Sequence, residues 1–269
     1  MNRRTFLKSV PALTILAAAK PNLTETVKEK NESYGQAVKA AFPPTDLQPI
    51  VLVPPQTEGG KSVLAALRER KTIRNIRDEK LSPQMLSNLL WAAWGVNRKS
   101  GPFGQIGRTA ASASNSQEID LYVVLPEGTY IYDAVAHHLN PVVAGDLRPK
   151  VSAHGRSGSM TIAPVILIYV VDIAKYSKSR LQEPGMRDAE IQKSYYNVAT
   201  GLIAGNVYLF AASQDLAAWF HNCNKPALAA ELTLRPTQRV LYAQTVGLPA
   251  RVRRKRFLFC GRPDNQQFK

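Results

Sequence analysis

The sequence predicts an α+β fold, in which helices and strands follow one another without a regular β-α-β alternation. A helix with clear start and stop signals covers residues 82–95, a β-hairpin pattern covers 121–132, and later strand and helix patterns mix irregularly. No glycine fingerprint follows the first predicted strand, which argues against a Rossmann domain.

The elements follow in order along the chain. Residues 21–60 are polar and then proline-rich, and we expect an extended arm rather than a packed element. A short helix is predicted for Ser62–Glu69. The next helix has Ser82 as its N-cap, Pro83 in its first turn and Gly95 at its end, with an apolar stripe at helical spacing.

The second half of the chain carries the other predicted strands and one long helix. Leu121–Leu125 and Tyr130–Tyr132 flank a Pro-Glu-Gly turn, and Ala163–Asp172 is apolar on both faces, as in a central strand. The run from Asn197 to Ala217 is apolar almost all round, which predicts a buried central helix more strongly than a membrane span. A last strand is predicted at about Val240–Val246.

Composition limits the class of protein. A chain of 269 residues with 45% hydrophobic and 20% charged residues suits one larger globular domain, with or without extensions. Of the net charge of +15, the first 19 residues contribute +3 and the residues after Ala250 contribute +6, which leaves +6 for the body. The body has no basic stripe interleaved with aromatic residues, so we expect no nucleic-acid partner.

Residues 1–20 have the pattern of an export signal. Arg3, Arg4 and Lys8 precede a short apolar stretch, Val10–Ala19, that ends in small residues. The Arg-Arg pair followed by Phe-Leu-Lys resembles a twin-arginine signal, although a chance basic start remains the alternative. We therefore expect recognition by the twin-arginine machinery, a periplasmic or otherwise exported mature protein, and no stable membrane insertion.

Two polar clusters are candidates for a site. The stretch "RERKTIRNI", residues 68–76, is either a solvated helix end or a cradle for a phosphate dianion. The stretch "RTAASASNSQ", residues 108–117, is either a turn-rich polar loop or the lip of a site for a flat polar heterocycle. The two cysteines and four histidines lack the spacing of a metal site, so we expect no metal.

In combination these stretches resemble the FMN-dependent nitroreductase superfamily. The similarity also includes "LLWAAWGVNR", "EGTYIYD", "GDLRPK", "GNVYLFAAS" and "LYAQTVGLPA", in family order from about Val53 to Ala250. It is closest to the branch of azoline-oxidising dehydrogenases of peptide maturation (streptolysin/thiocoraline-type). The resemblance implies a nitroreductase-like domain at residues 61–250, with a central, mostly antiparallel sheet flanked by helices, followed by a basic tail at 251–269.

The resemblance also implies roles for individual residues. Arg70 and Lys71 would bind the FMN phosphate, Thr72 would donate its hydroxyl, and Arg74 would lie near the flavin pyrimidine, where negative charge gathers on reduction. A further set is expected to complete the cofactor site: Ser112, Asn115 and Gln117 beside the flavin ring, and Arg251 at the phosphate. Alanine at position 111 and glycine at 205 depart from the family pattern.

The function implied is that of an FMN-dependent oxidoreductase. Ping-pong hydride transfer through flavin N5 would pass electrons from a small-molecule donor to a nitro, quinone or similar small organic acceptor, in a homodimer with two flavins at its interface. No side chain is assigned as a catalytic acid or base. Two alternatives stay open: an azoline-type ring dehydrogenase, and a non-enzymatic adaptor that binds an acidic surface through its basic tail.

Overall fold

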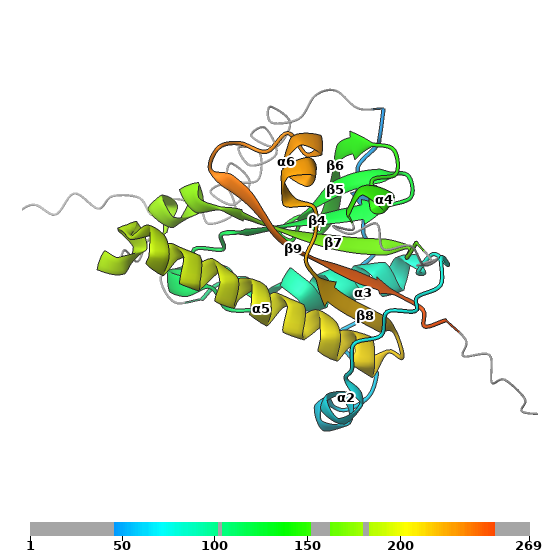
Figure 1. Ribbon diagram of the computed structural model, residues 1–269. Helices are drawn as coiled ribbons and strands as arrows, with labels where there is room; N and C mark the ends of the chain where they lie inside the picture. Colours follow the sequence, from blue (N-terminus) through cyan, green and yellow to red (C-terminus); the bar gives the residue numbers. More distant parts are fainter. Residues whose placement is uncertain (1–45, 102–103, 152–161, 180–182, 251–269) are drawn as a thin grey trace, which may run out of the picture. The chain divides into compact units, whose positions relative to one another are not determined.

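The computed structural model describes residues 46–101, 104–151, 162–179 and 183–250 (Figure 1). The predicted signal at 1–20, most of the predicted arm and the tail at 251–269, including Arg251, lie outside the described residues.

A seven-stranded sheet with the order β1-β6-β5-β4-β7-β9-β8 forms the centre of the fold, and every neighbouring pair in it is antiparallel. The α+β class and the central antiparallel sheet are therefore confirmed. Its strands are β1 (Ile50–Val51), β4 (Ile119–Leu125), β5 (Gly128–Asp133), β6 (His138–Ala144), β7 (Val165–Asp172), β8 (Ala217–His221) and β9 (Gln238–Gly247). A separate two-stranded sheet pairs β2 (Val96–Arg98) with β3 (Gly107–Arg108).

The helices flank this sheet. Figure 1 shows α3 and α5 on one side of it and α6 on the other. The described α-helices are α2 (Val63–Glu69), α3 (Pro83–Trp94), α4 (Arg148–Val151), α5 (Ala189–Ser213) and α6 (Lys225–Glu231), and the described 3-10 turns are η2 (Ala113–Asn115), η3 (Ile173–Lys178) and η4 (Pro184–Arg187). None of the helices in these ranges is long and apolar enough to cross a membrane.

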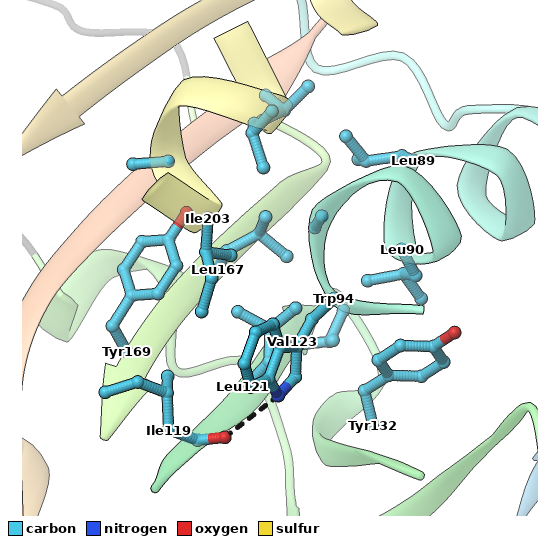
Figure 2. Close-up of a cluster of buried hydrophobic side chains, with 14 of the residues drawn as sticks. Leu89, Leu90, Trp94, Ile119, Leu121, Val123, Tyr132, Leu167, Tyr169 and Ile203 are labelled. Carbon is cyan, nitrogen blue, oxygen red and sulfur yellow. Dashed lines mark hydrogen bonds between the residues drawn. The ribbon is translucent and has the colours of Figure 1, made fainter. Parts of the chain in front are cut away.

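The main core lies between the sheet and the pair α3 and α5 (Figure 2). Leu90 and Trp94 of α3 and Ile203 of α5 pack on buried residues of β4 and β7. The Trp94 indole Nε1 donates to the Ile119 carbonyl at 3.1 Å, so this buried tryptophan of α3 is also oriented by a hydrogen bond.

Local capping signals predicted two helices well. The Ser82 hydroxyl accepts a hydrogen bond from the Met85 amide at the start of α3, and Gly95 ends that helix. The Ser62 hydroxyl accepts from the Ala65 amide at the start of α2. The predicted hairpin is also confirmed, with β4 and β5 joined at residues 126–127.

The prediction for α5 was wrong in its bounds and in its burial. The helix begins at Ala189, because the Asp188 carboxylate accepts hydrogen bonds from the amides of Glu190 and Ile191. It ends at Ser213, and Ala217, predicted to be helical, starts β8. One face is exposed rather than buried, since Val198 is 59% exposed and Leu202 is 45% exposed.

The expectation that the arm is not a packed element was wrong for its last part. Ile50 and Val51 pair with β6 as the edge strand β1, and Leu52 is buried. The Val53 carbonyl accepts a hydrogen bond from the Ser87 hydroxyl of α3, and the Gln56 amide donates to the Asn88 side chain at 2.8 Å. The apolar residues between the prolines supply this packing. The proline-rich composition of the arm did not predict it.

Candidate functional site

The stretch at residues 68–76, called the arginine segment below, leads from the end of α2 past β8 to the residues that follow β9. The Ile73 amide donates to the Ala218 carbonyl of β8 at 3.0 Å, and the Arg77 amide donates to the Leu248 carbonyl at 2.8 Å. The Ala250 amide in turn donates to the Asn75 carbonyl at 2.8 Å. Backbone hydrogen bonds on both sides therefore fix the position of the segment relative to the sheet.

Tyr208 of α5 organises the side chains at this segment. Its hydroxyl accepts a hydrogen bond from the Phe220 amide at 2.8 Å and shares another with the Thr72 hydroxyl at 3.1 Å. The Arg70 guanidinium carbon lies 5.5 Å from the centre of the Tyr208 ring, within cation–π range. One tyrosine thus connects α5, β8 and two of the predicted phosphate ligands.

Three cations of the segment lack an acidic partner in the part of the chain that the structure describes. Among the described residues, Arg70, Lys71 and Arg74 form no ion pair. Their neighbour Arg68 differs, because it lies 3.5 Å from the Glu69 carboxylate. The Arg74 guanidinium lies over the Trp219 ring, 5.6 Å from its centre. An uncompensated group of cations with a nearby hydroxyl suits a dianionic phosphate.

The small-polar loop, residues 112–117, forms its own compact network. The Ser112 hydroxyl accepts from the Gln117 amide at 3.0 Å, and the Asn115 side chain donates to the Ile106 carbonyl at 3.0 Å. The Gln117 side chain accepts from Arg108 Nε at 2.7 Å and donates to Asn115 Oδ1 at 3.1 Å. Structure therefore brings Ser112, Asn115 and Gln117 together.

The backbone of this loop is strained, and side chains from another part of the chain hydrogen-bond to it. Ser114, Asn115 and Gln117 have φ angles of 48°, 51° and 51°, the left-handed region that residues other than glycine rarely adopt. The Ser179 hydroxyl donates to the Ser114 carbonyl at 2.8 Å, and Lys175 Nζ donates to the Gln117 carbonyl at 3.2 Å. These contacts stabilise a conformation that the loop sequence does not favour.

The arginine segment and the tip of the loop contact different parts of α5. Thr72 contacts Tyr208, whereas the Ser114 hydroxyl donates to Glu183, which also accepts from the Tyr195 hydroxyl. Tyr195 and Tyr208 are thirteen residues apart, which is about 20 Å along a helix at 1.5 Å per residue. Within one chain the loop tip therefore lies well away from the arginine segment.

Comparison with known proteins fits this arrangement of fold and site. The model of the nitroreductase family matches residues 67–248, a range that includes both clusters, 68–76 and 108–117. The chain belongs to the nitroreductase family. A crystal structure of a candidate nitroreductase from Ralstonia eutropha JMP134 is 33% identical with a TM-score of 0.67, and the match covers 78% of this chain and 93% of that one.

A more distant relative in sequence and a more distant solved structure also match this chain. A candidate nitroreductase of Methanocaldococcus jannaschii is 26% identical over 157 residues, which is 56% of this chain and 73% of the relative. A chain in the E. coli microcin synthetase McbBCD complex, solved with a truncated pro-MccB17, is 20% identical with a TM-score of 0.55. That match covers 91% of this chain and 84% of the other, and at this identity it shows the fold alone.

Within this nitroreductase domain, β8 places aromatic groups beside the arginine segment. The Trp219 and His221 rings stack with centroids 4.3 Å apart. His221 Nδ1 lies 2.8 Å from the Asn222 carbonyl and so carries a proton, while Nε2 lies 2.8 Å from the Thr245 hydroxyl. Burial lowers the pKa of His221, which favours the neutral ring, and both of its nitrogens are engaged.

Sequence reasoning missed Tyr208 and Trp219, although both lie against predicted site residues. Tyr208 is part of an apolar helix pattern in which a tyrosine is indistinguishable from a core residue, and its role follows only from the position of β8. Arg251 lies outside the described residues. In the described part of the chain, no group of three or more histidine, cysteine, aspartate or glutamate side chains is arranged to hold a metal ion.

Proposed function

We propose that this nitroreductase-family protein is an exported FMN-dependent oxidoreductase that reduces a nitro, quinone or similar small organic acceptor. The observation that carries the proposal is the group of Arg70, Lys71 and Arg74, which no described carboxylate neutralises, beside the Thr72 hydroxyl. When bound, FMN would supply ping-pong hydride chemistry at its N5 atom between a small-molecule electron donor and the acceptor.

The residues of the chain would bind and orient the cofactor. Arg70 and Lys71 would neutralise the phosphate, and Thr72, held by Tyr208, would add a hydroxyl donor. Arg74 would place a fixed positive charge beside the ring system, where it favours the reduced form. Arg251 is proposed as a further phosphate ligand, since the preceding residue, Ala250, is hydrogen-bonded to Asn75.

We further propose that two chains complete each site. Val198, Gly201, Leu202 and Gly205 form one exposed or half-exposed stripe of α5 at helical spacing. A Cβ built at either glycine would meet nothing within 4 Å, so packing within the chain does not require glycine there, and each glycine costs about 1 kcal/mol relative to alanine. Close approach of α5 from a second copy accounts for both glycines and for the exposed apolar residues.

The separation of the loop tip at Ser114 from Thr72 of the arginine segment supports the same assembly. A two-fold partner can place its small-polar loop over the ring of a flavin whose phosphate lies on the first chain's arginine segment. We expect an obligate-type interface of more than roughly 2,000 Å² in total and flavin binding that is coupled to dimerisation. A Leu202→Glu variant should dissociate the dimer and lose flavin, whereas Leu64→Glu, a change on the exposed face of α2, is the comparison. A flavin-loaded monomer at micromolar concentration would refute this assembly.

The decisive experiment for the function is purification of the mature protein and identification of any bound flavin. We expect a yellow protein that releases FMN on denaturation and is bleached anaerobically by a small-molecule donor, with colour restored by a quinone or nitro acceptor. Oxidation of an azoline ring with bleaching of the flavin would favour the dehydrogenase instead. A colourless protein that does not bind added FMN would favour the adaptor.

A further inference from the structure

An apolar pocket of about 220 Å³ lies where β4 turns into β5. Its described walls come from β1 and the following arm, the start of α3, the β4–β5 turn and the start of β7, with Leu81, Leu86, Leu125 and Val165 among them. The polar side chains of this described lining are Lys80 and Glu127, which lie 3.5 Å apart as an ion pair. The pocket is thus an apolar hollow with one charged edge.

The wall formed by the arm is incompletely covered by the described residues. Val51 is 71% exposed and Val53 is 38% exposed, and both line the pocket. Together with the hollow, the two exposed valines make a continuous apolar surface that another segment can cover.

The described chain ends beside this pocket. Gly247, the last residue of β9, packs so closely on Pro164 that a Cβ there would lie 2.8 Å from the proline ring, and Pro164 lines the pocket. Ala250 is hydrogen-bonded to Asn75, which precedes the lining residue Lys80 by five positions. The residues that follow Ala250 therefore start within a short distance of the hollow.

The sequence after Ala250 has a composition that matches this surface. Arg251–Arg256 contains five basic residues, and the apolar residues Phe257, Leu258 and Phe259 follow directly. Six extended residues span up to about 20 Å, whereas β9 and β4 are two strand spacings apart, or about 10 Å. The tail is long enough to reach the pocket.

Charge also favours this path. The carboxylates of Asp78, Glu79 and Glu127 have exposed fractions of 51%, 55% and 40%, and all lie on the segment and turn between Asn75 and the pocket. Asp146 adds a fourth carboxylate through its pair with Arg148, against the three cations Arg77, Lys80 and Arg148. This end of the sheet is slightly acidic on a chain that is otherwise basic.

We propose that Phe257–Phe259 of the same chain docks in this pocket, with the basic residues before it lying along the carboxylates. Tethering by a few residues gives an effective concentration in the millimolar range, so that an apolar contact with a Kd well below a millimolar is largely formed. The proposal does not depend on flavin binding, and it leaves Arg251, the first residue of the tail, free to reach the arginine segment.

The test uses the native Cys260, next to Phe259, as a chemical handle in the full chain. A Val51→Cys substitution at the exposed pocket wall provides the second thiol, and a short bismaleimide joins the two. Cys223 is buried and burial raises its pKa to about 11, so it competes poorly. The matched control is Arg239→Cys, which is exposed on β9 eight residues before Gly247, or about 26 Å away along the strand.

We expect a single-chain product joining residues 51 and 260 in the Val51→Cys protein, at a yield several times that of the control. Phe257→Ser with Phe259→Ser should reduce the yield to the control level, while Cys260 still reacts with a monofunctional maleimide. Equal yields in both cysteine variants, a yield unaffected by the serine substitutions, or a product in which two chains are joined would each overturn docking of the tail on its own chain.

Discussion

Replacement of Arg70 by alanine should weaken FMN binding while leaving the fold intact. The Arg70 side chain is exposed, it lies over the Tyr208 ring, and no described carboxylate pairs with it. Its loss therefore costs the chain only an exposed cation–π contact, about 0.5–1 kcal/mol. A hydrogen bond to a charged phosphate contributes more, about 1.5–3 kcal/mol, which corresponds to about a ten- to hundredfold increase in the Kd for FMN.

The assay is titration of the apoprotein with FMN, followed by quenching of flavin fluorescence, with urea unfolding of the apoprotein as the measure of stability. Arg68→Ala is the matched control, because Arg68 is two residues away, equally basic, 77% exposed and paired with Glu69. We expect the control to change the Kd for FMN by less than about threefold, because the free energy of a surface ion pair is under about 1 kcal/mol.

Two outcomes would contradict the reasoning. An unchanged Kd in Arg70→Ala would remove this residue from the phosphate site. Equal weakening in the two variants would mean that the effect reflects the net charge of the region rather than a positioned ligand.

Three other predictions concern separate parts of the chain. Arg74→Gln should retain FMN but lower its two-electron potential, by about 30 mV if the lost charge interaction is about 1.4 kcal/mol. An unchanged potential would disprove the role of Arg74. The control is Arg77→Gln, because Arg77 forms an ion pair with Glu79. Arg3→Lys with Arg4→Lys should leave the uncleaved protein in the cytoplasm, and a cleaved periplasmic form in cell fractions would exclude the twin-arginine route. Burial lowers the pKa of His137, whose ring contacts the Ser87 and Tyr132 hydroxyls and the Val53 carbonyl. The unfolded chain then binds more protons, so the free energy of unfolding should decrease as the pH falls below about 6.5; a His137→Gln variant with an equally steep pH dependence in urea unfolding would contradict this.

The parts of the fold that could be predicted are those specified by neighbouring residues. The bounds of α3 follow from Ser82, Pro83 and Gly95, which act within a turn of one another. β6 escaped prediction because Asn140 and Pro141 interrupt its pattern, and its strand conformation is set by pairing with β5, including an irregularity near Tyr130. The seven-residue helix α6, which the Asn224 side chain caps, is too short for a periodic signal.

In the candidate site, too, features specified by neighbouring residues could be predicted and features set by tertiary contacts could not. Hydroxyl and amide residues predicted the small-polar loop, yet the left-handed conformations at Ser114, Asn115 and Gln117 depend on Lys175 and Ser179, about sixty residues away in sequence. No local pattern encodes such support. The same holds for Tyr208, whose hydroxyl has a function only because β8 brings the Phe220 amide to it.

The stretch Arg68–Ile76 shows why a cluster of basic residues has no fixed meaning in a sequence. We propose that its two interpretations, a solvated helix end and a phosphate cradle, apply to different residues on either side of the end of α2 at Glu69. Glu69 lies 3.5 Å from Arg68 and 2.7 Å from Lys61, so the cations on the helix side are neutralised. Arg70, Lys71 and Arg74 follow that end, where β8 and α5 present aromatic rings and no described carboxylate. Charge alone could not separate the two groups, because the positions of the carboxylates are set by the tertiary fold.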